Sequence, residues 1–93
     1  MIKTFRCKET ERLYSERLSS KRFRSFADTA YRKLIQLDEA GQLRDLQGIP
    51  GNRLEKLGGN RRGQYSVRIN QQWRICFRWE QGDGYDVEIV DYH

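Results

Sequence analysis

Three segments near the C-terminal end of the chain alternate between apolar and polar residues, the pattern of β-strands that bury one face. Their apolar positions are Tyr65, Val67 and Ile69, then Trp73, Ile75, Phe77 and Trp79, and finally Val87 and Ile89. Residues 70–72 predict a short hairpin connection, and residues 81–84 predict a longer one that contains glycines, as between antiparallel strands. This part of the chain therefore predicts an antiparallel sheet.

The same alternation separates two faces of the middle strand. Trp73, Trp79 and the apolar residues between them share one face, which we expect to meet helices. We therefore interpret both tryptophans as core residues rather than base-stacking ones. Arg74 and Arg78 fall on the opposite, open face, with Arg68 of the preceding strand as a candidate neighbour.

In the first half of the chain, apolar residues recur at the spacing that is typical of α-helices. Residues 2–6 are expected to be a short extended segment that could pair as a strand. Thr10 is expected to cap a short basic helix reaching Leu18. Ser25, with Asp28 three positions later, predicts the start of a second helix, which ends at Ala40-Gly41.

Another helical turn is expected at residues 43–46, before a glycine- and proline-bearing break. Residues 52–63 are glycine-rich and basic, and we interpret them as a functional loop. The chain is expected to form one domain, residues 1–93. The predicted fold is α+β: a small, mostly antiparallel four-stranded sheet with two N-terminal helices packed on one face.

Positive charge is concentrated in parts of the chain. The net charge is +5, and residues 48–79 carry seven basic side chains and one acidic one. A protein this basic commonly binds a polyanion, although a solvated basic surface is the simpler alternative. Residues 80–93 carry five acidic side chains and no basic one, so they could neutralise part of the basic patch.

Several classes of protein are excluded by composition. No long apolar run is present and the N-terminal residues lack the apolar stretch of a signal peptide, so we expect a cytoplasmic protein without a membrane span. Cys7 and Cys76 lie far apart in the sequence and lack metal-ligand spacing, so we expect two reduced, packed thiols of a cytoplasmic protein, with a disulfide between them as the less favoured alternative. No metal site and no cofactor are predicted.

The chain ends with Asp91-Tyr92-His93, and His93 is its only histidine. Metal-free RNA cleavage needs a base, an acid and a cation that stabilises the phosphorane. His93 is the natural acid or base. In a continuous strand Asp91 shares its face and could orient it, while Tyr92 points to the other face, where stacking or positioning is favoured over proton transfer. A disordered end is the alternative for this terminus, and pairing with an acid of the last strand is the alternative for Arg74.

Five stretches of the chain resemble the HigB branch of the RelE/ParE toxin superfamily, and the resemblance covers essentially the whole chain. They are Gly51–Leu57, Gly59–Arg61, Tyr65–Asn70, Gln72–Phe77 and Val87–His93. The resemblance implies a RelE-like fold and a small ribonuclease of a type II toxin–antitoxin pair. Such a toxin cuts mRNA on the translating ribosome, and a HigA-like partner with a helix-turn-helix domain neutralises it.

Carried over residue by residue, the resemblance implies a catalytic set of Asp91, Tyr92, His93 and Arg74. Lys56 and Arg61 fall in the basic loop, and with Arg68 and Arg78 they are the expected RNA contacts. One departure concerns that loop, where some members place a further histidine and this chain has Glu55-Lys56.

Two alternatives share the expected fold or charge. A ParE-like inhibitor of DNA gyrase has the same fold and cleaves nothing, whereas a basic RNA-binding domain would bind without catalysis. The terminal Asp91-Tyr92-His93 run favours the nuclease, because a gyrase inhibitor needs no proton-transfer group there.

Overall fold

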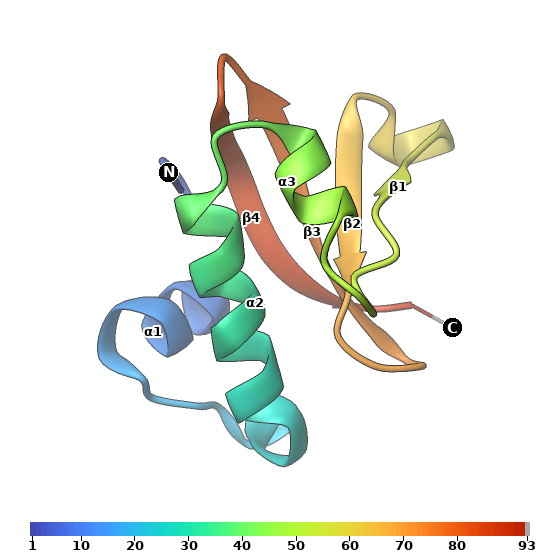
Figure 1. Cartoon of the computed structure of the whole chain (residues 1–93). Helices are drawn as coiled ribbons and strands as arrows, with labels where there is room; N and C mark the ends of the chain where they lie inside the picture. The colour runs from blue at the N-terminus through green and yellow to red at the C-terminus, as the bar shows by residue number, and fades with distance from the viewer. Residues whose placement is uncertain (93) are drawn as a thin grey trace.

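A computed structural model describes residues 1–92 and confirms the α+β fold (Figure 1). The helices are α1 (Lys8–Glu16), α2 (Ala27–Glu39) and α3 (Leu43–Gln47), with 3₁₀ helices η1 (Lys21–Phe26) and η2 (Gly59–Arg61). The strands are β1 (Glu55–Lys56), β2 (Gln64–Arg68), β3 (Trp73–Glu80) and β4 (Asp83–Asp91). None of the helices in this described part is long and apolar enough to cross a membrane.

The four strands form one antiparallel sheet in the order β1-β2-β3-β4, and both predicted hairpins are present. Between β3 and β4 the turn residues Gln81 and Gly82 have φ angles of 50° and 85°, as a two-residue type I′ turn requires. Between β2 and β3 the Asn70 side chain accepts hydrogen bonds from the backbone N–H groups of Gln72 and Trp73, both at 2.8 Å.

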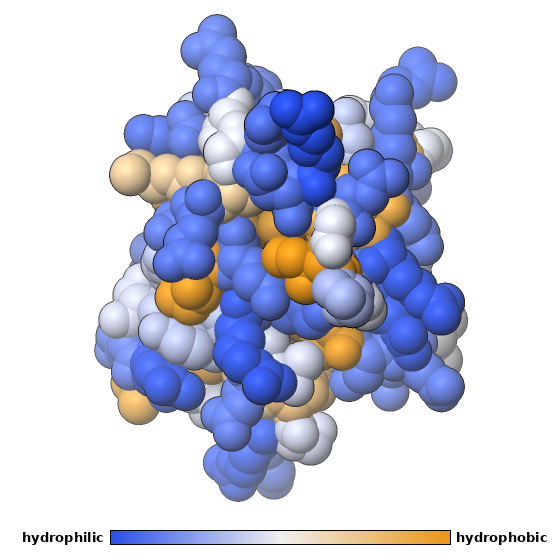
Figure 2. Space-filling view, in the orientation of Figure 1, coloured by the Kyte–Doolittle hydropathy of each residue, from blue (hydrophilic) through white to orange (hydrophobic). Residues whose placement is uncertain are grey.

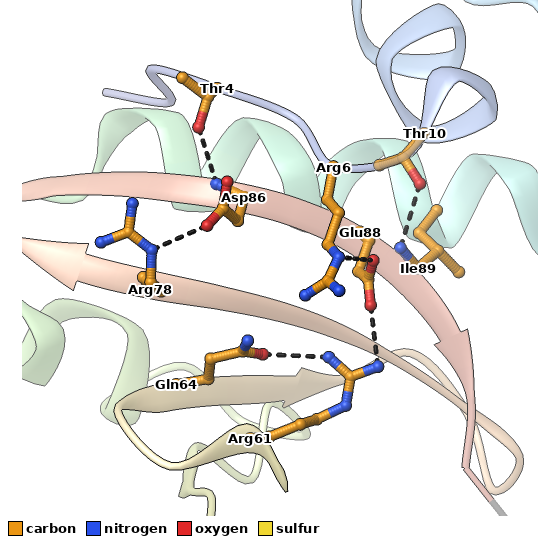
Figure 3. A network of polar contacts seen from close by, with 9 residues as sticks. All are labelled: Thr4, Arg6, Thr10, Arg61, Gln64, Arg78, Asp86, Glu88 and Ile89. Carbon is orange, nitrogen blue, oxygen red and sulfur yellow. Dashed lines mark hydrogen bonds and ion pairs between the residues drawn. The ribbon is translucent and has the colours of Figure 1, made fainter.

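The expected strand at residues 2–6 is replaced by two isolated parallel bridges, from Ile2 to Gly84 and from Phe5 to Val87. A bulge explains the interruption, since Asp86 of β4 has a φ of 53° and donates its N–H to Thr4 Oγ1 (Figure 3). The fourth strand is instead β1, which lies inside the segment predicted to be a loop.

The predicted division of the sheet into two faces is confirmed. The core joins Leu34 and Leu37 of α2 and Leu46 of α3 to the apolar face of the sheet, and it contains Val67, Ile75, Phe77, Val87 and Ile89. Trp73 and Trp79 pack against it, as expected. Figure 2 shows mostly hydrophilic residues on the viewed face, with small separate hydrophobic patches. Arg74 lies on the other face of the sheet, opposite the face that packs against α2 and α3.

Both predicted helix starts are wrong. α1 begins after Cys7, so Thr10 lies inside the helix, where its buried hydroxyl accepts a hydrogen bond from Ile89 N at 3.0 Å (Figure 3). The hydroxyl thus joins α1 to β4 instead of capping. Ser25 lies within η1, which runs directly into α2, because the buried Phe23 and Phe26 hold this turn against the core. The predicted end of α2 at Ala40 is confirmed.

Candidate active site

The C-terminal ends of β2 and β4 meet the segment that follows α3 at one end of the sheet (Figure 1). Two short backbone hydrogen bonds hold them there: Arg68 N donates to Asn52 O at 2.6 Å, and Tyr92 N donates to Gln72 O at 2.5 Å. A cavity of about 390 Å³ opens among these segments, and we call it the Arg74 hollow. It is lined by Arg53, Glu55, Arg68, Asn70, Gln71, Arg74 and Tyr92.

The side chain of Arg74 is only 8% exposed and is fixed on several sides. Its Nε donates to Ser66 Oγ at 2.7 Å, and Nη2 donates to the backbone oxygen of Arg53 at 2.5 Å. A guanidinium carries five N–H groups in one plane, so these bonds set the direction of the remaining ones. Arg74 is thus a pre-oriented cation at the wall of a cavity, suited to an anionic oxygen of a phosphate.

Tyr92 lies on the same side of the sheet as Arg74, with the guanidinium carbon of Arg74 5.8 Å from the centre of the Tyr92 ring. Asp91 pairs with Trp73 in the sheet register, and its carboxylate accepts a hydrogen bond from Gln72 Nε2 at 3.0 Å. The side chains of Asp91 and Tyr92 therefore point to opposite faces of the sheet, as strand alternation predicts. His93 lies outside the described residues.

Glu55 was not selected from the sequence as a site residue. Its carboxylate lies 3.6 Å from Nη1 of Arg74 and its side chain is 53% exposed. Of the described residues that line the Arg74 hollow, it is the one acid. Its place in the loop, where some members of the resembled family have a histidine, was the available signal. Arg53 and Ser66 were also missed, because they act through their contacts with Arg74.

Arg61 does not line the hollow. Its Nη2 donates to Glu88 at 2.8 Å and its Nη1 donates to Gln64 at 3.0 Å (Figure 3). Glu88, 14% exposed, also pairs with Arg6 at 3.6 Å. Burial alone would lower the pKa of Arg61, but the hydrogen bond and charge of Glu88 raise it overall. The pair satisfies both charges within the sheet face.

Arg78 lies at the other end of β3 from the hollow. It donates to Asp86 at 2.8 Å (Figure 3). It also pairs with Glu80. Lys56 is exposed on the edge strand β1, where it faces Tyr65 in the register. Of the four expected RNA contacts, the structure brings only Arg68 to the hollow beside Arg74. Within residues 1–92, no group of three histidine, cysteine or acidic side chains could hold a metal ion.

Comparisons with known proteins identify relatives of this chain. Residues 3–93 match a family model described as the RelE-like toxin of type II toxin-antitoxin system HigB. Toxin HigB-1 of Vibrio cholerae is 40% identical over 86 residues, which are 88% of this chain and 87% of that protein. Endoribonuclease HigB of Proteus vulgaris is 30% identical over 93 residues and the full length of both chains.

A solved structure shares the fold at lower identity. The chain is similar to the YoeB-YefM complex from Staphylococcus aureus, with a TM-score of 0.60 and 20% identity, covering 100% of this chain and 98% of the other. At this identity the similarity supports the fold alone.

Proposed function

The chain belongs to the HigB family of RelE-like toxins of type II toxin–antitoxin systems, and we propose that it is an endoribonuclease whose reaction takes place in the Arg74 hollow. One observation carries the proposal. A buried, hydrogen-bonded arginine lines the same open cavity as a carboxylate and an aromatic ring.

The proposed reaction uses the RNA's own 2′-hydroxyl as the nucleophile. The 2′-oxygen loses its proton and attacks the adjacent phosphorus, the bond from phosphorus to the 5′-oxygen breaks, and that oxygen gains a proton. The products are a 2′,3′-cyclic phosphate and a 5′-hydroxyl. No water or metal is consumed, so the protein has to supply a proton acceptor, a proton donor and a fixed cation.

Each role has a candidate in this chain. Arg74 stabilises the phosphorane through its unused N–H groups, and Arg68, which lines the same hollow, adds positive charge. Tyr92 positions a nucleotide by stacking. Glu55 and His93 share the two proton transfers, and Asp91 orients the terminal residues. In this proposal Arg61 and Arg78 are not direct phosphate ligands, because Glu88 and Asp86 already neutralise them.

The family supports a proposal for the biological setting. We propose that the substrate is mRNA under translation, that the ribosome presents it, and that the protein acts in the cytoplasm without a metal cofactor. Its inhibitor would be a HigA-like antitoxin with a helix-turn-helix domain. The family match and the relative named an endoribonuclease support nuclease activity over gyrase inhibition.

Induced expression of the chain alone tests this proposal. Growth should stop, and mapping of transcript 5′ ends should show breaks within translated codons. Arg74→Ala should abolish both effects, while Arg24→Ala, which changes an exposed arginine of η1, should retain them. Antitoxin binding by each variant controls for folding. Intact transcripts together with DNA breaks would instead identify a gyrase inhibitor.

A further inference from the structure

A second cavity, of about 440 Å³, lies between α2 and the segment that follows α3, and we call it the Lys33 hollow. Its lining includes Arg32, Lys33, Gln36, Gly51, Arg68 and Asn70. Arg68 and Asn70 also line the Arg74 hollow. The two cavities are therefore neighbours that share one arginine, on the side of the proposed active site that faces α2.

The charge in the Lys33 hollow is positive throughout. Arg32, Lys33 and Arg68 contribute side chains, and no acidic residue of the described chain lines the cavity. None of the three forms an ion pair within residues 1–92. This distinguishes them from Arg61 and Arg78, which are paired with carboxylates.

The hydrogen-bond partners of these cations are neutral. Lys33 Nζ donates to Asn52 Oδ1 at 2.5 Å, and the fully buried Asn52 is itself anchored through Nδ2 to Leu46 O at 3.1 Å. Arg68 Nε donates to Asn70 O at 3.1 Å. Neutral partners fix the positions of the side chains and leave their charges uncompensated.

The three cations repel one another in this arrangement. Burial lowers the pKa of Lys33, and the charges of Arg32 and Arg68 lower it further. An anion placed among them would remove this repulsion. The geometry thus provides a site for a negatively charged group, formed by side chains of α2, β2 and the segment that follows α3.

We propose that the Lys33 hollow binds the sugar-phosphate backbone of RNA next to the cleaved nucleotide. The shared Arg68 makes a strand in the Arg74 hollow continuous with one in the Lys33 hollow, and phosphate is the repeating anion of that strand. Ile49 and Pro50 give the cavity an apolar wall against which a sugar or base can lie. The inference rests on the proposed ribonuclease function and deepens it by assigning a flanking subsite.

Two backbone sources share this chemistry: the strand that is cleaved and the RNA of the ribosome. Binding of two probes to the purified protein distinguishes them. The first is single-stranded 2′-O-methyl RNA, which cannot be cleaved, in lengths of about three and about twelve nucleotides. The first length lies below and the second within the ~4–16 nucleotides that an OB-fold site covers. The second is the ribosome, empty or carrying a message.

The test variant is Arg32→Gln with Lys33→Gln. Arg32→Glu is the variant that spares the fold, because Arg32 is exposed and its side-chain hydrogen bond is a long one, to Thr29 Oγ1 at 3.4 Å. Lys21→Gln with Arg24→Gln removes the same charge from η1, outside both hollows. We expect the longer RNA to lose affinity and its salt slope to fall by about 0.7 for each lost phosphate contact. The short RNA and the control variant should be unaffected.

Each result decides between the proposals. A defect with ribosomes alone, empty or loaded, assigns the subsite to ribosomal RNA. If Arg74→Ala weakens RNA binding while the Arg32 and Lys33 variants behave as wild type, the subsite is refuted and the proposed function stands. If neither probe binds the wild-type protein, both proposals fail. A variant whose only defect is weaker antitoxin binding would show that the hollow binds protein and overturn the inference.

Discussion

The guanidinium of Arg74 and the ring of Tyr92 face each other across 5.8 Å, although Arg74 lies in β3 and Tyr92 directly follows β4. Arg74 is held by Ser66 and by the backbone of Arg53, whereas the Tyr92 side chain is exposed at the end of β4. A fixed cation and an accessible ring therefore bound the same cavity. This pair places the proposed reaction at one end of the sheet.

Tyr92 should act through its ring rather than its hydroxyl. Tyr92→Phe is expected to retain cleavage of a translated message in a reconstituted system. Tyr92→Ala should be slower by about 10- to 100-fold, because stacking on one base contributes ~1–3 kcal/mol. Thermal unfolding should change little, since the side chain is exposed. Equal inactivity of both variants would show that the phenol transfers a proton.

Glu55 should be needed for proton transfer. Glu55→Gln keeps the size of the side chain and removes the base, so we expect cleavage to slow by about 10²- to 10⁴-fold with little change in unfolding. Glu80→Gln is the matched control, because Glu80 is a similarly exposed carboxylate paired with Arg78. His93→Ala should reduce the rate comparably. If Glu55→Gln cleaved at the wild-type rate, the carboxylate would serve only to orient Arg74.

Arg61 should contribute more to stability than to RNA binding. Arg61→Ala leaves the nearly buried Glu88 with only the longer contact to Arg6, and we expect a loss of about 1–3 kcal/mol in the free energy of unfolding. Adding Glu88→Gln should recover part of the lost free energy of unfolding. Urea denaturation of the single and the double variant measures the loss and the recovery.

The prediction that Arg61 contributes little to RNA binding is tested by measuring ribosome binding at several salt concentrations. The exposed Lys56 should change the salt slope more than Arg61 does when each is replaced by alanine. The opposite order would mean that Arg61 leaves Glu88 to contact phosphate.

Cys76 should be an inert thiol whose ionisation opposes folding at high pH. Burial raises its pKa from an ordinary 9.0 to about 11. The unfolded chain loses this proton first, so the free energy of unfolding falls as pH rises from about 9 to about 11. Cys76→Ala should remove that part of the fall. Alkylation at neutral pH should label the half-buried Cys7 first, and equal labelling of both would contradict this account.

Strand alternation made the sheet predictable and, with it, the place of Arg74. Once β2 and β3 were recognised as a hairpin, Arg68 and Arg74 had to be cross-strand neighbours, and they are partners in the register. The strand β1 could not be predicted, because two residues carry no periodicity. The prediction that Thr10 caps a helix is wrong because its hydroxyl accepts a hydrogen bond from Ile89 N, in a strand far along the chain.

The assignment of individual arginines needed the structure. Arg61 and Arg78 differ from Arg68 in having carboxylate partners on β4, and the bulge at Asp86 sets which carboxylate meets which arginine. A sequence gives the number of acids near the end of the chain but not the register across such a bulge. Glu55 became a candidate only when the structure placed its carboxylate beside Arg74.

The chemistry of the cut ends tests the central claim most directly. A message cleaved in a reconstituted translation system should yield fragments ending in a 2′,3′-cyclic phosphate and beginning with a 5′-hydroxyl. A single 2′-O-methyl group at the cleaved nucleotide should block the cut there. Arg74→Ala should release neither product while still binding the antitoxin. Fragments that begin with a 5′-phosphate, or undiminished cleavage by Arg74→Ala, would contradict a 2′-hydroxyl attack assisted by this arginine.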